Sequence, residues 1–313
     1  MSDQNQNGGT VFALYRYTPS IPAAVVFAVI FFILAAAQLF LIVRHRTYFF
    51  IPFIVGLLFE CAGYIARIFS HFNTLALGPY IVQTMLILVA PPLFAASIYM
   101  TLGRITVKLG AEEASMIPIR YLTKTFVVGD VVSFLLQMGG GGYMAVGTLG
   151  ALNIGAKIVI GGLAVQLLFF GFFVIAAAIF HWRVKQQVSR TRIGSYTHGS
   201  TARRSGMGSK LTWEKLMWAL YVACALILVR SIFRVVEFVE GNDGYVMRRE
   251  YWLYIFDAAL MTLAGASMTV FFPGFLLGRG ELKGSSAVEA FSSGEHEMSS
   301  RRLRTKHASG NRV

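Results

Sequence analysis

The stretch IPAAVVFAVIFFILAAAQLFLIV, residues 21–43, runs for 23 positions without a charged side chain. A helix rises about 1.5 Å per residue, so about twenty apolar residues cross a hydrocarbon core of about 30 Å. The stretch is also too long for the apolar core of a signal peptide, which indicates a retained helix. It therefore predicts a transmembrane helix.

Six further segments meet the same test along the 313 residues. Only 14% of the residues are charged and 56% are hydrophobic, whereas about a quarter of a soluble domain is charged. The sequence therefore predicts an all-α fold, a polytopic bundle of seven transmembrane helices. The fourth segment fits least well because it contains Lys124, Asp130, Gln137 and glycines 139–142. The predicted spans are 21–43, 48–69, 79–103, 122–144, 156–180, 216–238 and 252–277.

Lys and Arg residues are distributed unequally between the two sides of this bundle. The connections after the first, third and fifth spans and the C-terminal tail hold two, three, eight and seven of them, twenty in all, against three on the other side. Cytoplasmic loops retain positive charge, so we expect the N-terminus outside and the C-terminus in the cytoplasm. The predicted divisions are an extracellular segment at 1–20, a membrane domain at 21–280 and a disordered cytoplasmic tail at 281–313.

The net charge of +13 has its origin in these connections. It therefore points to contact with anionic lipid of the inner leaflet rather than to nucleic acid. The connection between the fifth and sixth spans is rich in Ser, Thr, Gly and Arg and is expected to be disordered. Cys61 and Cys224 lie inside apolar segments, so no disulfide framework is expected. Protein partners are not determined by the sequence.

Several polar side chains lie inside the predicted spans, where an ionised group costs a few kcal/mol and normally faces a partner or a wet cavity. Arg230, Arg234 and Glu237 are spaced by four and three residues and share one helical face. Asp257 falls in the same outer half of the membrane, so it is expected to pair with Arg230 or Arg234. The alternative is that buried ion pairs fix helix register only. The candidate binding residues are Glu60, Arg67, Asp130, Gln137, Arg230, Arg234, Glu237 and Asp257.

Proline and glycine mark three further places. Pro91 and Pro92 remove hydrogen bonds from the third span and are expected to bend it. Pro273 and Gly274 are expected to end or kink the seventh span. Glycines 139–142 either let a neighbouring backbone approach or unwind the end of the fourth span.

Several function classes lack their required residues. No phosphate-binding loop is present, and all six histidines lie in loops or the tail. The sequence thus predicts no enzyme activity, no metal and no cofactor. The seventh span has no lysine for a retinal Schiff base. The third and seventh spans also lack the motifs of G-protein-coupled receptors, although a receptor or sensor remains an alternative.

The charged segments resemble the fungal aminocholesterol-resistance, lipid-translocating exporter family. The resemblance covers roughly residues 20–280 in the right order. It rests on ECAGYIAR at 60–67, APPLFAASIYMTLGRI at 90–105, GDVVSFLLQMGGGG at 129–142, RSIFRVVEFVEG at 230–241, YIFD at 254–257 and FPG at 272–274. It implies a seven-helix protein of the plasma membrane, or alternatively of an internal membrane, that moves or resists sphingoid bases and other toxic amphiphiles.

The residue pattern and the resemblance lead to one leading hypothesis, which is the transport of an amphiphilic lipid such as a sphingoid long-chain base. Such a base has a protonated amine that the carboxylates Glu60, Asp130, Glu237 and Asp257 could receive, while the arginines keep those acids ionised. The converse hypothesis makes the arginines the site for an anionic head group. A seven-helix sensor that signals through its cytoplasmic loops is the alternative function.

Overall fold

The computed structural model describes residues 20–72, 77–108, 119–144, 146, 148–197, 207–240 and 250–277, and these residues are helical apart from short turns. They form seven long helical rods, the last of them built from consecutive pieces. In chain order the elements are α1 (Ile21–His45), the 3₁₀ turn η1 (Tyr48–Phe50), α2 (Ile51–Phe72), α3 (Leu77–Lys108), α4 (Ile119–Met144), α5 (Leu149–Thr197), α6 (Met207–Glu240), α7 (Glu250–Leu253), the π-helix η4 (Tyr254–Ala259), α8 (Leu260–Val270) and α9 (Gly274–Leu277).

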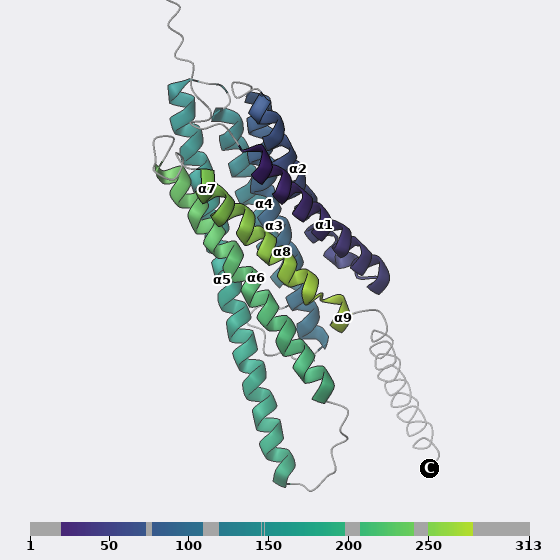
Figure 1. Ribbon diagram of the computed structural model, residues 1–313. Helices are drawn as coiled ribbons and strands as arrows, with labels where there is room; N and C mark the ends of the chain where they lie inside the picture. Colours follow the sequence, from purple (N-terminus) through teal and green to yellow (C-terminus); the bar gives the residue numbers. More distant parts are fainter. Residues whose placement is uncertain are drawn as a thin grey trace, which may run out of the picture.

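The rods form one elongated bundle (Figure 1). Consecutive helices pack against each other from α1 to α6, and α8 returns to pack between α6 and α1. One end of the bundle carries Ser20 and the start of α1, and the other carries Leu277; we call these the Ser20 end and the Leu277 end. α5 extends well beyond the other helices at the Leu277 end (Figure 1).

Six of the described helices are long and apolar enough to cross a membrane, and α4 is not among them. The predicted all-helical fold is thus confirmed, and six of the seven predicted spans are helices long and apolar enough to cross a membrane. α4 falls short because Asp130, Gln137 and its glycines lower its hydropathy. It is nevertheless a helix of 26 residues packed between α3 and α5.

Two sequence-based expectations need correction. The fifth helix was expected at 156–180, but α5 runs for 49 residues from Leu149 to Thr197, about 70 Å of helix. The expected disorder between the fifth and sixth spans is therefore wrong for residues 183–197 and 207–215, which are helical. The predicted tail at 281–313 and residues 1–19 of the N-terminal segment lie outside the described residues.

The proline and glycine predictions have separate outcomes. α8 ends at Val270 and α9 begins at Gly274, so the predicted break at Pro273 is confirmed. α3 continues as a helix through Pro91 and Pro92. α4 is helical as far as Met144, so its glycines do not unwind it.

Close backbone approach explains the glycines between α4 and α5. A Cβ added at Gly140 would lie 2.7 Å from the Gly155 carbonyl oxygen, and one at Gly162 would lie 2.8 Å from the Ser133 carbonyl oxygen. These distances are too short for real Cβ atoms, so the two helices can pack this tightly only with glycine at these positions.

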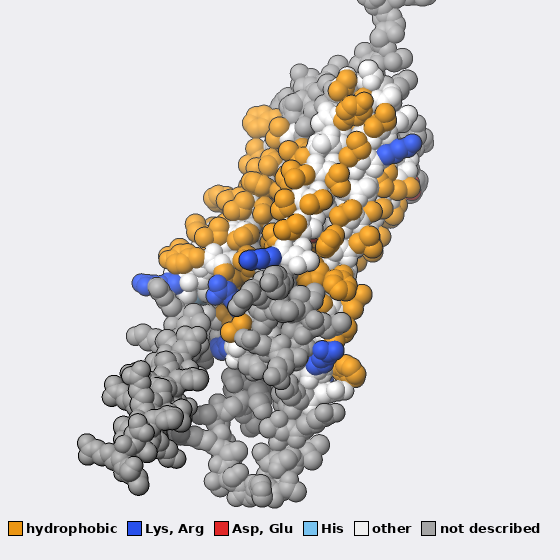
Figure 2. Space-filling view, turned by 180° about the vertical axis from the view of Figure 1, so that it is seen from behind, with side chains coloured by type: hydrophobic (Ala, Val, Ile, Leu, Met, Phe, Trp, Pro, Cys, Tyr) orange, Lys and Arg blue, Asp and Glu red, His pale blue; other side chains and the backbone are white. Residues whose placement is uncertain are grey.

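The face of the bundle in Figure 2 is largely apolar over its described residues. Large side chains such as Phe32, Phe40, Leu135 and Leu168 are more than half exposed. Lys and Arg side chains are sparse on the face in Figure 2 and lie mainly toward its lower part. An apolar surface of this extent requires a lipid environment.

Packed aromatic rings fill the Leu277 end. The ring centroids of Phe53 and Phe94 lie 4.2 Å apart, those of Phe50 and Phe53 lie 4.7 Å apart, and Phe272 meets Phe50 edge to face at 5.7 Å. Lys108 Nζ also donates a hydrogen bond to the Leu276 carbonyl oxygen. At this end of the bundle, α2, α3 and the segment that follows α8 therefore pack against one another.

Candidate functional site

Asp257 lies at the centre of a buried ion-pair network. Its Oδ1 is 2.5 Å from Arg230 Nε, and its Oδ2 accepts a hydrogen bond of 2.6 Å from Arg234 Nη2. Arg234 Nη1 donates a second bond of 2.9 Å to Glu237 Oε2. All four side chains are buried, and Asp257 is 0% exposed. We call Asp257, Arg230, Arg234 and Glu237 the Asp257 cluster. The predicted pairing of Asp257 is thus confirmed, with both arginines rather than with one.

The backbone that carries Asp257 departs from the α-helical pattern. Residues Tyr254–Ala259 form a π-helix between α7 and α8. A π-helical turn contains an extra residue and is frequent at functional sites. Because the turn is wider, Asp257 and the residues before it are rotated relative to a regular helix. Asp257 lies six residues after the exposed Tyr251. This places it about 9 Å along the helix from Tyr251, on the side away from the Ser20 end.

Arg230 also binds the backbone of α3. Its Nη2 donates a hydrogen bond of 2.7 Å to the carbonyl oxygen of Ile87. In a regular helix that oxygen would accept a bond from the amide four residues later, which here belongs to Pro91 and has no hydrogen. The proline therefore leaves a carbonyl in the bundle interior that the arginine uses. This is how α3 joins α6 and the π-helix.

Glu60 of α2 lies beside this network without a hydrogen bond of its own. It is 0% exposed, and neither carboxyl oxygen has a hydrogen-bond partner among the described residues. Asp257, Arg230 and Arg234 are the charged groups that act on it. One helical turn further, the hydroxyl of the buried Tyr64 also lacks a partner within the described residues. Two unpartnered polar groups therefore lie on the face of α2 that turns toward the cluster.

Arg67 lies two turns beyond Glu60 on α2 and meets the start of the π-helix. Its Nε donates a hydrogen bond of 3.1 Å to the Tyr254 hydroxyl. The Tyr254 ring is stacked on Phe27 of α1 at 5.6 Å. Arg67 is 1% exposed. It joins α2 to the seventh rod nearer the Ser20 end than the Asp257 cluster does.

The structure does not bring Asp130 and Gln137 into the cluster. Asp130 Oδ2 accepts a hydrogen bond of 3.0 Å from the Tyr99 hydroxyl, and Gln137 Nε2 donates one of 2.8 Å to Gln166 Oε1. Within the described part of the chain, neither side chain bonds a member of the Asp257 cluster. These pairs join α4 to α3 and to α5.

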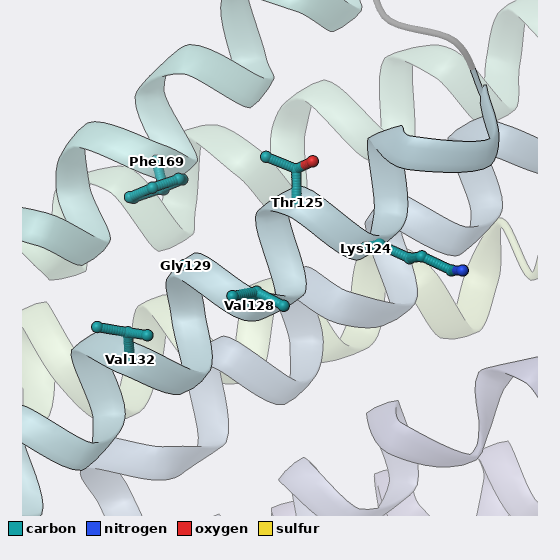
Figure 3. A pocket seen from close by; sticks show the side chains of 6 residues that line it. All are labelled: Lys124, Thr125, Val128, Gly129, Val132 and Phe169. Atoms are coloured by element: carbon teal, nitrogen blue, oxygen red, sulfur yellow. The ribbon is translucent and has the colours of Figure 1, made fainter.

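An open groove of about 410 Å³ runs along α4, apart from the Asp257 cluster. Figure 3 shows its lining, with Phe169 coming from α5. Apart from Lys124 and Thr125 the lining is apolar, and it contains no member of the Asp257 cluster. The groove therefore offers no converging polar groups. Its lining residues are Lys124, Thr125, Val128, Gly129, Val132 and Phe169.

Sequence reasoning missed several contributors to the site, namely Tyr64, Tyr254 and the Ile87 carbonyl. Their spacing in the sequence from Glu60, Asp257 and Pro91 could have identified them. Tyr64 follows Glu60 by four residues, Tyr254 precedes Asp257 by three, and Ile87 precedes Pro91 by four. Among the described residues, no group of three or more His, Cys, Asp or Glu side chains is arranged to hold a metal ion.

Comparison with known proteins identifies relatives over most of the chain. The family described as RTA1 like protein matches residues 53–280. Protein RTA1 of Saccharomyces cerevisiae is 37% identical over 84% of this chain and 85% of its own length. Protoporphyrin uptake protein 1 of the same yeast is 35% identical over 83% and 91% of the two chains. Sphingoid long-chain base transporter RSB1 of Saccharomyces cerevisiae is 26% identical over 82% of this chain and 72% of its own length. No solved structure matches the chain.

Proposed function

The chain belongs to the RTA1-like family of membrane proteins, and from this premise we propose that it transports or translocates amphiphilic lipids such as sphingoid long-chain bases. Such transport would confer resistance to toxic amphiphiles. Two of the relatives are named as an uptake protein and a transporter. The observation that carries the proposal is the Asp257 cluster with Glu60, a charged site enclosed by apolar helices.

A sphingoid base presents a charged amine on an apolar tail. Moving that amine through a bilayer requires a polar site within the membrane, because a bare charge there costs several kcal/mol (roughly 3 or more). The Asp257 cluster and Glu60 together supply acids on three elements: Glu60 on α2, Glu237 on α6 and Asp257 on the π-helix. The substrate-binding set we propose is therefore Glu60, Arg67, Arg230, Arg234, Glu237 and Asp257. Asp130 and Gln137 join helices instead.

An anionic amphiphile is the second substrate class, and one relative's name, protoporphyrin uptake protein 1, brings it forward. In that case the arginines would receive the head group. Arg230 and Arg234 are already engaged by Asp257, Glu237 and the Ile87 carbonyl. An anion would have to displace those partners, whereas Glu60 has no hydrogen-bond partner to lose within the described part of the chain. The geometry therefore favours a cationic head group.

We further propose that α4 is a seventh crossing and that the N-terminus lies outside. Asp130 and Gln137 of α4 bond Tyr99 and Gln166, so they face neighbouring helices rather than lipid.

The Leu277 end carries exposed Trp182 and Trp218, as expected at a membrane interface. Exposed Arg44, Arg46, Arg104 and Arg183 lie at the same end, which supports contact with anionic lipid of the inner leaflet. The plasma membrane is the proposed location.

This orientation can be tested with tags. A tag within residues 198–206 should be reachable only after cells are permeabilised, and a tag before Thr10 should be reachable in intact cells. Labelling of the first tag from outside would overturn the orientation.

The transport function itself is tested with purified protein in liposomes and a labelled sphingoid base. We expect transfer across the bilayer beyond the rate of protein-free liposomes, with no other protein present. A labelled anionic amphiphile provides the second arm of the test. Binding without transfer in either arm would contradict transport and support a sensor.

A further inference from the structure

We propose that Glu60 is the exchangeable cation site of the protein: it holds a proton when no substrate is bound and releases it when the ammonium group of the amphiphile binds. The inference rests on the transport function proposed above. It adds the energy source, because each cation carried in one direction would be exchanged for a proton.

The first observation is that Glu60 is enclosed and unsatisfied. Its side chain is 0% exposed, and both carboxyl oxygens lack a hydrogen-bond donor within the described residues. A buried carboxylate that accepts no hydrogen bond loses its hydration without replacement, and it becomes neutral instead of remaining charged. This geometry favours a cation at Glu60, and a proton is the smallest.

The second observation concerns the two arginines that face Glu60 from α6. Arg230 directs Nε to Asp257 and Nη2 to the Ile87 carbonyl. Arg234 directs Nη1 to Glu237 and Nη2 to Asp257. Their guanidinium groups are thus turned toward other acceptors. They contribute long-range attraction to Glu60 but no hydrogen bond.

The remaining charged and titratable groups near Glu60 come from the π-helix and from α2 itself, whereas α1 and α3 contribute apolar side chains and one backbone carbonyl. The π-helix contributes Asp257, whose negative charge opposes a second charge at Glu60. α2 itself contributes Arg67 two turns away and the Tyr64 hydroxyl one turn away. α1 contributes the apolar rings of Phe27 and Phe31, which lie 5.8 Å and 5.7 Å from the Tyr64 ring. α3 contributes the Ile87 side chain and carbonyl.

These surroundings are suited to reversible binding of a cation. In the loaded state the ammonium group would lie between the Glu60 carboxylate and the Tyr64 hydroxyl, whose oxygen can accept one of its hydrogen bonds. The step balances: the Glu60 carboxylic acid and the ammonium ion become a carboxylate–ammonium pair and one released proton. No bond of the substrate is broken and no electron is transferred.

The direct test measures protons released when a sphingoid base, added as its ammonium salt, binds purified protein in a weakly buffered solution containing a pH dye. Binding is measured in parallel with a radiolabelled base. The wild type should release about one proton per bound amine. Glu60→Gln should fold normally, because the amide resembles the protonated acid. It should release no proton and bind the amine about tenfold to a hundredfold more weakly.

Three further variants sharpen the result. Glu60→Asp keeps the acid and should retain proton release. Tyr64→Phe removes only the hydroxyl and should weaken binding without abolishing release. Glu214→Gln makes the same chemical change at an exposed position of α6 and should behave as the wild type.

The two proposals fail in different ways. A wild-type protein that neither binds nor transfers the amine contradicts the transport function. A wild type that binds the amine without proton release, or a Glu60→Gln protein that still releases a proton, overturns the role of Glu60 alone. In liposomes, transfer beyond that in protein-free vesicles should respond to a pH gradient for the wild type and not for Glu60→Gln.

Discussion

The Asp257 cluster and the α4–α5 contact both place polar side chains inside an apolar bundle, but they satisfy them differently. Between α4 and α5 the pairing is simple: Gln137 meets Gln166, and glycines let the backbones touch. In the Asp257 cluster, charged groups from α6 and the π-helix share partners, and α3 supplies a carbonyl. Beside the cluster, Glu60 has no hydrogen-bond partner among the described residues.

This difference separates packing from binding. The Gln137–Gln166 pair carries no charge and holds two helices in register, although Gln137 Oε1 has no hydrogen-bond partner among the described residues. The Asp257 cluster is charged, it joins groups from α3, α6 and the π-helix, and it lies beside an acid that has no hydrogen-bond partner within the described residues. The first arrangement is therefore expected to affect stability alone, and the second to affect both stability and transport.

The largest effect should come from Asp257→Asn. It leaves Arg230 with the Ile87 carbonyl but no acid, and Arg234 with Glu237 alone. Removal of one member of a buried pair typically costs about 3–5 kcal/mol in soluble proteins. We expect most of the folded protein to be lost, as measured by fluorescence-detected size-exclusion chromatography. Adding Arg230→Gln should restore charge balance and folded protein, while transport stays lost.

Because Asp257 contacts both arginines, exchanging the charges of Asp257 and Arg230 should not rescue the protein. Asp257→Arg with Arg230→Asp would place a new arginine beside Arg234. Full recovery of abundance and transport in that variant would contradict the shared pairing.

The next effect should come from Pro91→Ala, which restores an amide hydrogen that competes with Arg230 for the Ile87 carbonyl. Alanine is about 3 kcal/mol more favourable than proline inside a helix, so the melting temperature should not fall. A hydrogen bond from a charged group is worth about 1.5–3 kcal/mol, so transport should fall about tenfold or more. Pro92→Ala is the matched control, and equal transport in both variants would argue against this role for Pro91.

A smaller effect is expected from Gly140→Ala at the α4–α5 contact. The added methyl group would meet the Gly155 carbonyl oxygen at 2.7 Å, and overpacking of this kind costs about 1–3 kcal/mol. The melting temperature should fall, while transport per folded molecule stays unchanged. Gly139→Ala, which has no atom within 4 Å of the added Cβ, should be neutral or stabilising. Destabilisation by both changes would mean that close approach is not the cause.

The smallest effect should come from the Gln137–Gln166 pair. Interhelical hydrogen bonds in a membrane contribute about 0.6 kcal/mol on average. A double-mutant cycle with Gln137→Ala and Gln166→Ala, measured by unfolding in detergent, should give a coupling of that order and no change in transport. A strong transport defect here would move the functional site toward α4 and erase the distinction between the two regions.

The sequence predicted the helices better than their contacts. Residues 21–43 and 216–238 were correctly placed in helices, and Pro273 was correctly identified as a break. The length of α5 was underestimated because hydropathy marks where a helix crosses lipid and not where it ends. The helical residues 183–197 are polar, so nothing in their composition distinguished them from a loop.

For the candidate site, the spacing of Arg230, Arg234 and Glu237 was enough to place them on one face and to predict a pair with Asp257. The same reasoning included Asp130 and Gln137 among the candidate binding residues, because they are polar side chains inside a predicted span and the rotation of α4 was not known. It also gave no sign that Glu60 would have no hydrogen-bond partner among the described residues.

The sequence by itself therefore determined the helical class, the order and approximate extent of the rods, and the types of charge that the bundle must bury. These features follow from local properties, since backbone hydrogen bonds within a helix join residues four positions apart and hydropathy acts on each segment separately. Tertiary structure alone decided that Asp257 joins two arginines and that Arg230 uses the carbonyl freed by Pro91. It also decided that a π-helix presents Asp257 and that Glu60 has no hydrogen-bond donor among the described residues. Those contacts join residues far apart in the chain, and they depend on how each helix is rotated and packed against its neighbours.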